Sequence, residues 1–223
     1  MATATIAAPA VSPGITLRNV DWETYRQLRD EPANRRVRMS YLDGTLILMS
    51  PDRVHDHDAE ILGLLIRGVT AGLGLEVMGI GSTTLRREGR GPIQGAGKEP
   101  DSAFFLGENE RRMRRKKTLD LAVDPPPDLA IEVDNRSDSE AALPIYARIG
   151  VPEVWRYDVR RNVLRFGRLA DDSYEEVDRS VALPRLTPAL VLEALDVLDR
   201  GDMGENAWSD WLRGWARGLP AAV

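Results

Sequence analysis

Two acidic segments, each set in an apolar run, carry the side chains best suited to chemistry. The first is residues 99–105 (EPDSAFF) and the second is residues 127–134 (PDLAIEVD). In the second, apolar residues alternate with Glu132 and Asp134, and this period of two predicts a strand with one apolar and one acidic face. A carboxylate in such a strand is costly to bury unless a cation or hydrogen bonds compensate its charge.

Two such strands lying side by side would bring Asp101, Glu132 and Asp134 together. Carboxylate oxygens are the ligands that hard divalent cations prefer, so the pattern predicts a Mg²⁺ or Mn²⁺ site with Asp101 and Glu132 as ligands. All three acids are candidate catalytic residues. The structural alternative is that these are ordinary strand carboxylates paired with arginines.

A basic segment separates the two acidic ones, because six of the seven residues 111–117 are Arg or Lys. It is either a solvated surface segment or a patch that contacts nucleic-acid phosphates. It contains no aromatic residue, so base stacking is not indicated. The candidate nucleic-acid-binding residues are Arg111, Arg112, Arg114, Arg115, Lys116 and Lys117.

The segment from His55 to Asp58 (HDHD) holds both histidines of the chain. A solvated first helical turn is favoured over a metal site, because no third ligand of a metal-site type follows nearby. His55 could still face the carboxylates if its helix packs beside their strands, and it is kept as an accessory candidate.

Composition narrows the functional classes. The absence of cysteine excludes disulfides, thiolate catalysis and zinc sites built on Cys, and it is compatible with the cytoplasmic location that we expect. The net charge of −5 does not favour a protein that coats nucleic acid non-specifically. No apolar run approaches the roughly 20 residues that span a bilayer, so no membrane partner is expected. We expect a flexible tail over residues 1–14 and a single domain over 15–223.

Periodicity and turn residues predict an α/β chain. The strongest local signal is Asp43-Gly44 between two β-prone runs, which predicts a hairpin of residues 37–41 and 45–49. Residues 87–97 are rich in glycine and charge, and they are expected to form a mobile loop. The other expected strands are 76–80, 82–86, the two acidic segments, 151–158, 163–169 and 174–177, the last three forming a meander.

Helices are expected over residues 20–28, 52–73 and 137–149, with two more after Thr187. The helix at 137–149 has Ser137 as its predicted N-cap, and Pro144 predicts an irregular start. The last helix carries Trp208, Trp211 and Trp215 at helical spacing. These side chains are expected to dock on the core, with a homodimer contact through this helix or the hairpin as the alternative.

Several stretches in this order resemble one known family. They are residues 41–46 with 49–51, His55-Asp56, residues 81–85, residues 99–101, residues 126–134, and residues 144–147 through 150–157. The chain from about Val20 to about Trp215 resembles the Uma-two family of restriction endonucleases, within the PD-(D/E)XK superfamily. The resemblance implies a restriction-endonuclease-like core, with a central mixed β-sheet flanked by helices.

The resemblance also implies an activity, the metal-dependent hydrolysis of phosphodiester bonds in DNA. Asp101 matches the aspartate of the superfamily's Pro-Asp element, and Glu132 matches its second acidic residue. In the superfamily these carboxylates and a backbone carbonyl, here near Val133, hold Mg²⁺. The metal polarises the scissile phosphate and lowers the pKa of a bound water.

One departure from the family pattern concerns its lysine. The superfamily's lysine falls at Asp134 here, and family members often carry a lysine on the next helix, where this chain has Ala142. Residues 118–223 contain no lysine. The candidate substitutes are Lys98, Arg136 and Arg148, although arginine stays protonated and is a poor general base. The alternative function is therefore a catalytically impaired nuclease-fold protein that binds nucleic acid or a protein partner.

Overall fold

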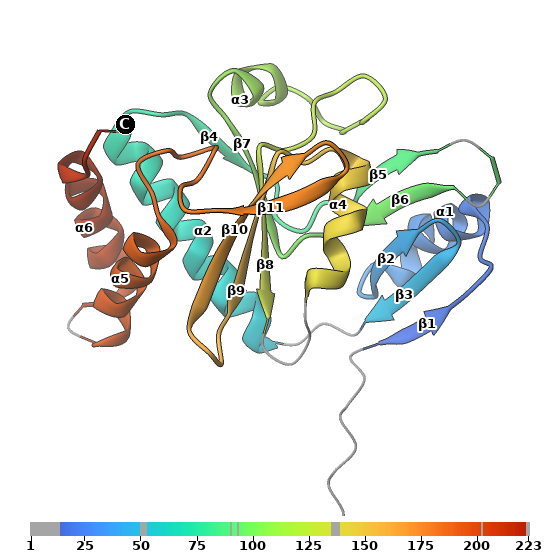
Figure 1. Ribbon diagram of the computed structural model, residues 1–223, viewed down its shortest axis with the longest axis horizontal. Coiled ribbons are helices and arrows are strands. Elements are labelled where there is room, and N and C mark those ends of the chain that lie inside the picture. Colours follow the sequence, from blue (N-terminus) through green and yellow to red (C-terminus); the bar gives the residue numbers. More distant parts are fainter. Residues whose placement is uncertain are drawn as a thin grey trace, which may run out of the picture.

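The computed structural model describes residues 14–49, 53–89, 91–92, 94–134, 139–201 and 203–221, without the side chains of 53–56. The tail predicted over 1–14 therefore lies, apart from Gly14, outside the described residues. In the described chain the strands form two sheets, sheet 1 and sheet 2, with helices on both sides of sheet 2 (Figure 1). The predicted α/β class and the mixed sheet flanked by helices are confirmed, and sheet 1 is an addition to the single central sheet expected.

Sheet 1 is antiparallel throughout. Its order is β1 (Ile15–Leu17), β3 (Thr45–Met49), β2 (Arg38–Leu42), β6 (Gly95–Lys98) and β5 (Leu85–Glu88). The predicted hairpin is confirmed as β2 and β3, with Leu42 opposite Thr45. Asp43 and Gly44 both have positive φ, 42° and 87°, as the tight two-residue hairpin turn requires.

The loop predicted over residues 87–97 is wrong at both ends. β5 continues to Glu88, and β6 pairs with strands on both its sides. The Gly-Ala-Gly sequence of β6 has little β propensity, but its glycines make room for α1 (Trp22–Asp30). A Cβ on Gly95 or Gly97 would overlap the ring of Trp22 or Tyr25 respectively. This segment therefore forms a strand because it packs against α1, and not because of its own β propensity.

Sheet 2 is mixed, because β8 and β9 are parallel and the other neighbours are antiparallel. The predicted meander is confirmed as β9, β10 and β11. The order is β11 (Ser173–Val177), β10 (Val163–Ala170), β9 (Glu153–Asp158), β8 (Leu129–Asp134), β7 (Ser102–Leu106) and β4 (Val77–Gly79). The strands predicted on either side of Gly81, β4 and β5, are thus in different sheets.

The helices cover sheet 2 on two sides (Figure 1). α2 (Arg53–Leu73), α5 (Pro188–Asp199) and α6 (Glu205–Gly218) pack on one side, where Leu129, Ile131 and Val133 of β8 join their core. On the other side α4 (Leu143–Ile149) lies between the two sheets and contacts strands of both. α3 (Gly107–Met113) follows β7, and a short 3-10 helix, η1 (Pro32–Asn34), follows α1.

The start of α4 and the docking of the last helix were both predicted from the sequence. The irregular start ahead of Pro144 is confirmed, because a 3-10 turn, η2 (Ser139–Ala142), precedes α4. The predicted cap Ser137 lies outside the described residues. Docking on the core is confirmed for Trp208, which is fully buried and donates from Nε1 to the Ala194 carbonyl at 2.9 Å.

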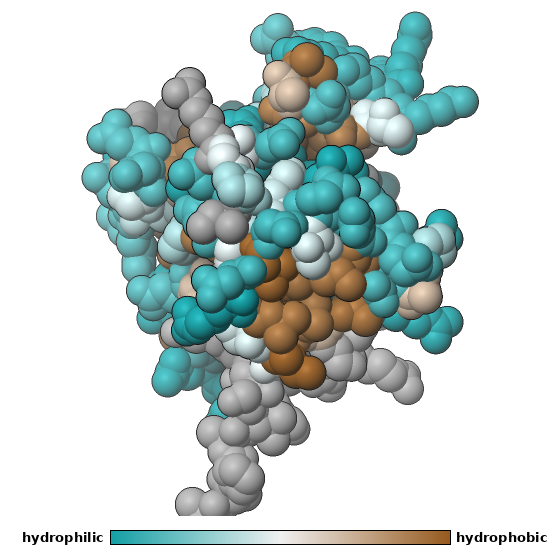
Figure 2. Space-filling view, turned by 90° about the vertical axis from the view of Figure 1, so that its right-hand side faces the viewer, coloured by the Kyte–Doolittle hydropathy of each residue, from teal (hydrophilic) through white to brown (hydrophobic). Residues whose placement is uncertain are grey.

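The side of the molecule that carries sheet 1 has an apolar area within a mostly hydrophilic surface (Figure 2). In the edge strand β1, Ile15 and Leu17 are 66% and 39% exposed. Among the described helices, none is long and apolar enough to cross a membrane.

Candidate active site at the junction of the two sheets

Asp101 lies where the chain passes from sheet 1 to sheet 2. Lys98 ends β6 in sheet 1, and β7 begins in sheet 2 directly after Asp101. The Asp101 backbone N–H donates to the Ile131 carbonyl at 3.2 Å, and its Oδ2 accepts from the Val133 N–H at 2.8 Å. The side chain thus extends the β7–β8 ladder beyond the strand and fixes the carboxylate against β8.

Glu132 lies in β8 on the face toward α4 and is 6% exposed. Its Oε2 lies 3.1 Å from Lys98 Nζ, and its Oε1 accepts a hydrogen bond from the Tyr146 hydroxyl of α4. Burial raises the pKa of Glu132 to about 7, with the Lys98 ammonium opposing the shift and the Asp101 charge adding to it. Asp101 therefore lies close enough for its charge to affect the ionisation of Glu132.

Each carboxylate of the pair has one cationic partner and one further hydrogen-bond donor. Arg38 Nη1 lies 2.5 Å from Asp101 Oδ1. This contact is the pairing with arginine that the structural alternative predicted for the strand carboxylates. Glu132 is paired with a lysine instead. Arg38 gave no signal in the sequence, because its partner lies 63 residues further along the chain.

Asp134, the third predicted catalytic acid, holds the segment that follows its strand. Its Oδ1 accepts from the Ser139 backbone N–H and its Oδ2 from the Ser139 hydroxyl, both at 2.8 Å. These two bonds tie the end of β8 to the start of η2. Asp134 shares the α4-facing side of the strand with Glu132, as the period of two predicted.

The position of the family's lysine is near the site, although the lysine is absent. Ala142 ends η2 and is buried one turn before Tyr146, so positions 142 and 146 fall on the same side of that segment. This i, i+4 spacing is the signal that could have identified Tyr146 as a partner of Glu132. Lys98 supplies a buried ammonium from the opposite side, from β6.

Of the other accessory candidates, only Arg148 has a described side chain, and it is bonded elsewhere. Arg148 forms two hydrogen bonds to Asp43 at the hairpin turn, at 3.2 and 3.0 Å. Arg136 lies outside the described residues, and of His55 only the backbone, in α2, is described.

A cleft of about 660 Å³ opens beside Asp101. Asp101 and Ser102 line it, whereas Glu132 and Lys98 are buried and do not. Its walls carry four arginines, which are Arg35, Arg36, Arg38 and Arg67.

The basic segment 111–117 lies elsewhere. It belongs to α3 and the turn after it, which follow the far end of β7, about 17 Å from the end that carries Asp101. Three of its cations have partners within their own region. Arg114 pairs with Glu110, Lys116 pairs with Asp124, and Arg112 donates to the Val123 carbonyl at 2.8 Å.

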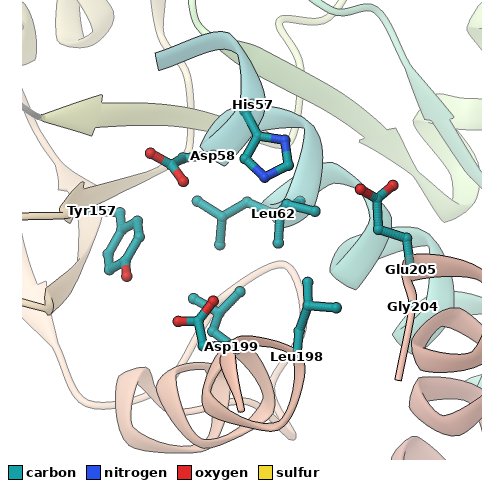
Figure 3. Close-up of a pocket in the computed structure, with 10 residues that line it drawn as sticks. His57, Asp58, Leu62, Tyr157, Leu198, Asp199, Gly204 and Glu205 are labelled. Carbon is teal, nitrogen blue, oxygen red and sulfur yellow. The ribbon is translucent and has the colours of Figure 1, made fainter. Parts of the chain in front are cut away.

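A second hollow, of about 330 Å³, lies between α2, β9, α5 and α6 (Figure 3). His57 and Asp58 face it from α2, together with Tyr157, Asp199 and Glu205. Burial raises the pKa of the Tyr157 hydroxyl, and the Asp199 and Asp58 charges add to the shift. Asp101 and Glu132 do not line this hollow. In the described chain, no three His, Cys, Asp or Glu side chains are grouped to hold a metal ion.

Comparison with known proteins identifies one family. The model of the Uma2 family, described as a putative restriction endonuclease, matches residues 22–199, which include both carboxylates, Lys98 and Tyr146. No curated protein matches the chain significantly.

Proposed function

Because the chain belongs to the Uma2 family, we propose that it is a metal-dependent endonuclease that hydrolyses phosphodiester bonds in DNA. One observation carries the proposal: Asp101, just ahead of β7, and Glu132, in the neighbouring strand β8, converge beside an open cleft. Family membership supports the nuclease class, and the convergence supports the reaction and its metal.

The carboxylates fit a hard divalent cation such as Mg²⁺ or Mn²⁺. Mg²⁺ is commonly held by one or two protein carboxylates, with water and substrate phosphate completing its shell, so a pair of acids is sufficient. The mutual repulsion of Asp101 and Glu132 contributes to the raised pKa of Glu132, and a cation between them would relieve it. Asp101, Glu132 and the backbone carbonyl of Val133 would hold the metal. When bound, the metal would polarise the phosphate and make a bound water more acidic.

The remaining residues hold the acids and supply positive charge. The Tyr146 hydroxyl and Lys98 Nζ take one oxygen each of Glu132, so both fix its orientation. Arg38 and the Val133 N–H do the same for Asp101. We assign to Lys98 the role of the family's lysine, which is to stabilise negative charge that develops on the phosphate.

Cleavage of supercoiled plasmid in Mn²⁺ tests the proposal. The wild-type chain should nick the plasmid, and Asp101→Asn and Glu132→Gln should each abolish nicking. Asp210→Asn changes a 75% exposed acid on α6 and should cleave normally. Cleavage that survives Asp101→Asn would refute this assignment.

Metal binding has a readout that is independent of cleavage. Mn²⁺ should raise the melting temperature of the wild-type chain, because a ligand that binds only the folded state stabilises it. The rise should be absent in Asp101→Asn and retained in Asp210→Asn. An equal rise in all three proteins would place the metal elsewhere.

The replacement of the family's lysine by Ala142 favours a second candidate, a catalytically impaired protein that binds nucleic acid. It predicts DNA binding without cleavage in any divalent metal. The 3.1 Å contact of Lys98 with Glu132 is the reason to prefer the active enzyme.

A further inference from the structure

We propose that the cleft beside Asp101, and not the basic segment 111–117, holds the phosphate backbone of DNA. The inference rests on the proposed function in one respect, that Asp101 marks where the scissile phosphate lies. It goes further by identifying the substrate-holding surface and the way in which it binds.

The arginines of the cleft come from two separate parts of the chain. Arg67 projects from α2, and Arg35, Arg36 and Arg38 lie on the segment that leads from η1 into β2. Arg38 is bonded to Asp101, so the cleft places positive charge directly beside the candidate catalytic carboxylate. A nucleic-acid strand lying in the cleft would present successive phosphates to them.

Three of the four arginines are available to a ligand. Arg35, Arg36 and Arg67 are exposed, and within the described part of the chain their side chains form no ion pair or hydrogen bond. Arg67 lies over Gly79, where a Cβ would come within 2.5 Å of its Nη2. The missing side chain at residue 79 thus lets the guanidinium lie against the end of β4.

The acids of the cleft do not cancel this charge. Glu99 is buried and paired with Arg29 at 2.8 Å, and Asp101 is paired with Arg38. Glu60 is the remaining acid in the lining and is exposed. Counting only the residues that the structure describes, three arginines without an ion pair therefore face one such carboxylate, which leaves a positive surface on a chain whose net charge is −5.

The lining also indicates how DNA is bound. Among the described residues of the lining, Phe104 is the aromatic one, and it is 1% exposed, so these residues offer bases no ring on which to stack. Binding would therefore rest on contacts of the arginines with phosphates rather than on stacking. Such binding depends steeply on salt, with a slope of about 0.9 in log affinity against log salt for each phosphate neutralised.

A pair of matched triple variants tests the assignment. The cleft variant is Arg35→Ala/Arg36→Ala/Arg67→Ala, and the control is Arg111→Ala/Arg115→Ala/Lys117→Ala in the basic segment. Both remove three exposed cations for which no ion pair is found in the described residues. Binding to a short labelled DNA duplex is measured by fluorescence anisotropy in EDTA, which prevents cleavage, and the melting temperature of each protein confirms its folding.

The cleft variant should bind at least about ten-fold more weakly at low salt, with a salt slope shallower by up to about 2.7, and the control should match the wild type. Single Arg67→Glu should weaken binding more than Arg67→Ala. Loss of binding in the control alone, or equal binding by all three proteins, would overturn the proposal.

This experiment separates the two proposals. If the wild type cleaves in a metal-dependent way while the cleft variant binds normally, the nuclease proposal stands and the cleft assignment fails. If the cleft variant loses binding but the wild type cleaves nothing, the cleft assignment stands and the nuclease proposal fails.

Discussion

At the scale of single residues, Glu132 is a buried acid that is held by two different partners, one charged and one neutral. Lysine and tyrosine each donate to one of its oxygens, yet burial outweighs both and raises its pKa to about 7. Such an acid gains a proton in the pH range where many enzymes work.

The first prediction concerns this proton. Between the ordinary pKa of 4.5 and about 7, the folded chain binds more protons at Glu132 than the unfolded chain does, so the free energy of unfolding falls as the pH rises. The loss across this window should reach up to about 3 kcal/mol. Glu132→Gln should remove this slope in urea unfolding without metal, whereas Glu175→Gln, at an exposed site, should retain it. An unchanged slope in Glu132→Gln would show that Lys98 keeps the acid ionised throughout.

The second prediction concerns the lysine. Lys98→Ala should lower the nicking rate by about a hundred-fold or more, the usual cost of losing one group that stabilises the transition state. Adding Ala142→Lys should restore part of that rate, because position 142 lies one turn before Tyr146. Adding Glu140→Lys instead, at an exposed position of η2, should restore nothing. Equal rescue by both lysines would mean that only the added charge matters.

At the scale of elements, sequence could predict what is encoded locally. Asp43-Gly44 specified the hairpin because both residues tolerate positive φ, and the alternation in residues 127–134 specified β8 and its acidic face. β6 escaped prediction because its glycines are explained by the rings of α1, far away in the chain. Lys98 ends this strand, so its contact with Glu132 could not be derived from spacing and was only one of several candidates.

The third prediction tests that packing. Gly97→Ala should destabilise the chain by about 1–3 kcal/mol or more, because its methyl group would overlap the buried Tyr25 ring. In a double-mutant cycle, Tyr25→Ala should remove much of this cost by vacating the space. Gly214→Ala, where a Cβ meets nothing within 4 Å, should be neutral or stabilising. Additive losses at residues 25 and 97 would contradict this account of β6.

At the scale of the whole molecule, the residues of the candidate site come from both sheets. The hydrophobic clusters that pack on these two sheets differ in size. Asp101 and Glu132 belong to the sheet 2 side, whose core is shared with α2, α5 and α6. Lys98 and Arg38 come from sheet 1, where five buried residues of α1, β2 and β3 form a small cluster of their own, while Ala96 of β6 joins a second cluster with α4, β8 and β9. The sequence predicted the acids from the two acidic segments in apolar runs, supported by the family motif, but not that their cations would come from a different sheet.

This division has a consequence for how the proposed nuclease activity should be lost on warming. Local opening of the α1, β2 and β3 part of sheet 1 would withdraw Arg38 while sheet 2 and its helices stay folded. We therefore expect nicking to be lost at a lower temperature than far-UV circular dichroism, with the amides of β2 and β3 exchanging hydrogen before those of β8 and β9. Loss of activity and of circular dichroism at one temperature, with uniform exchange, would show that the two sheets unfold as one. If the prediction holds, cooling the sample should return full activity, because the carboxylate half of the site never left its fold.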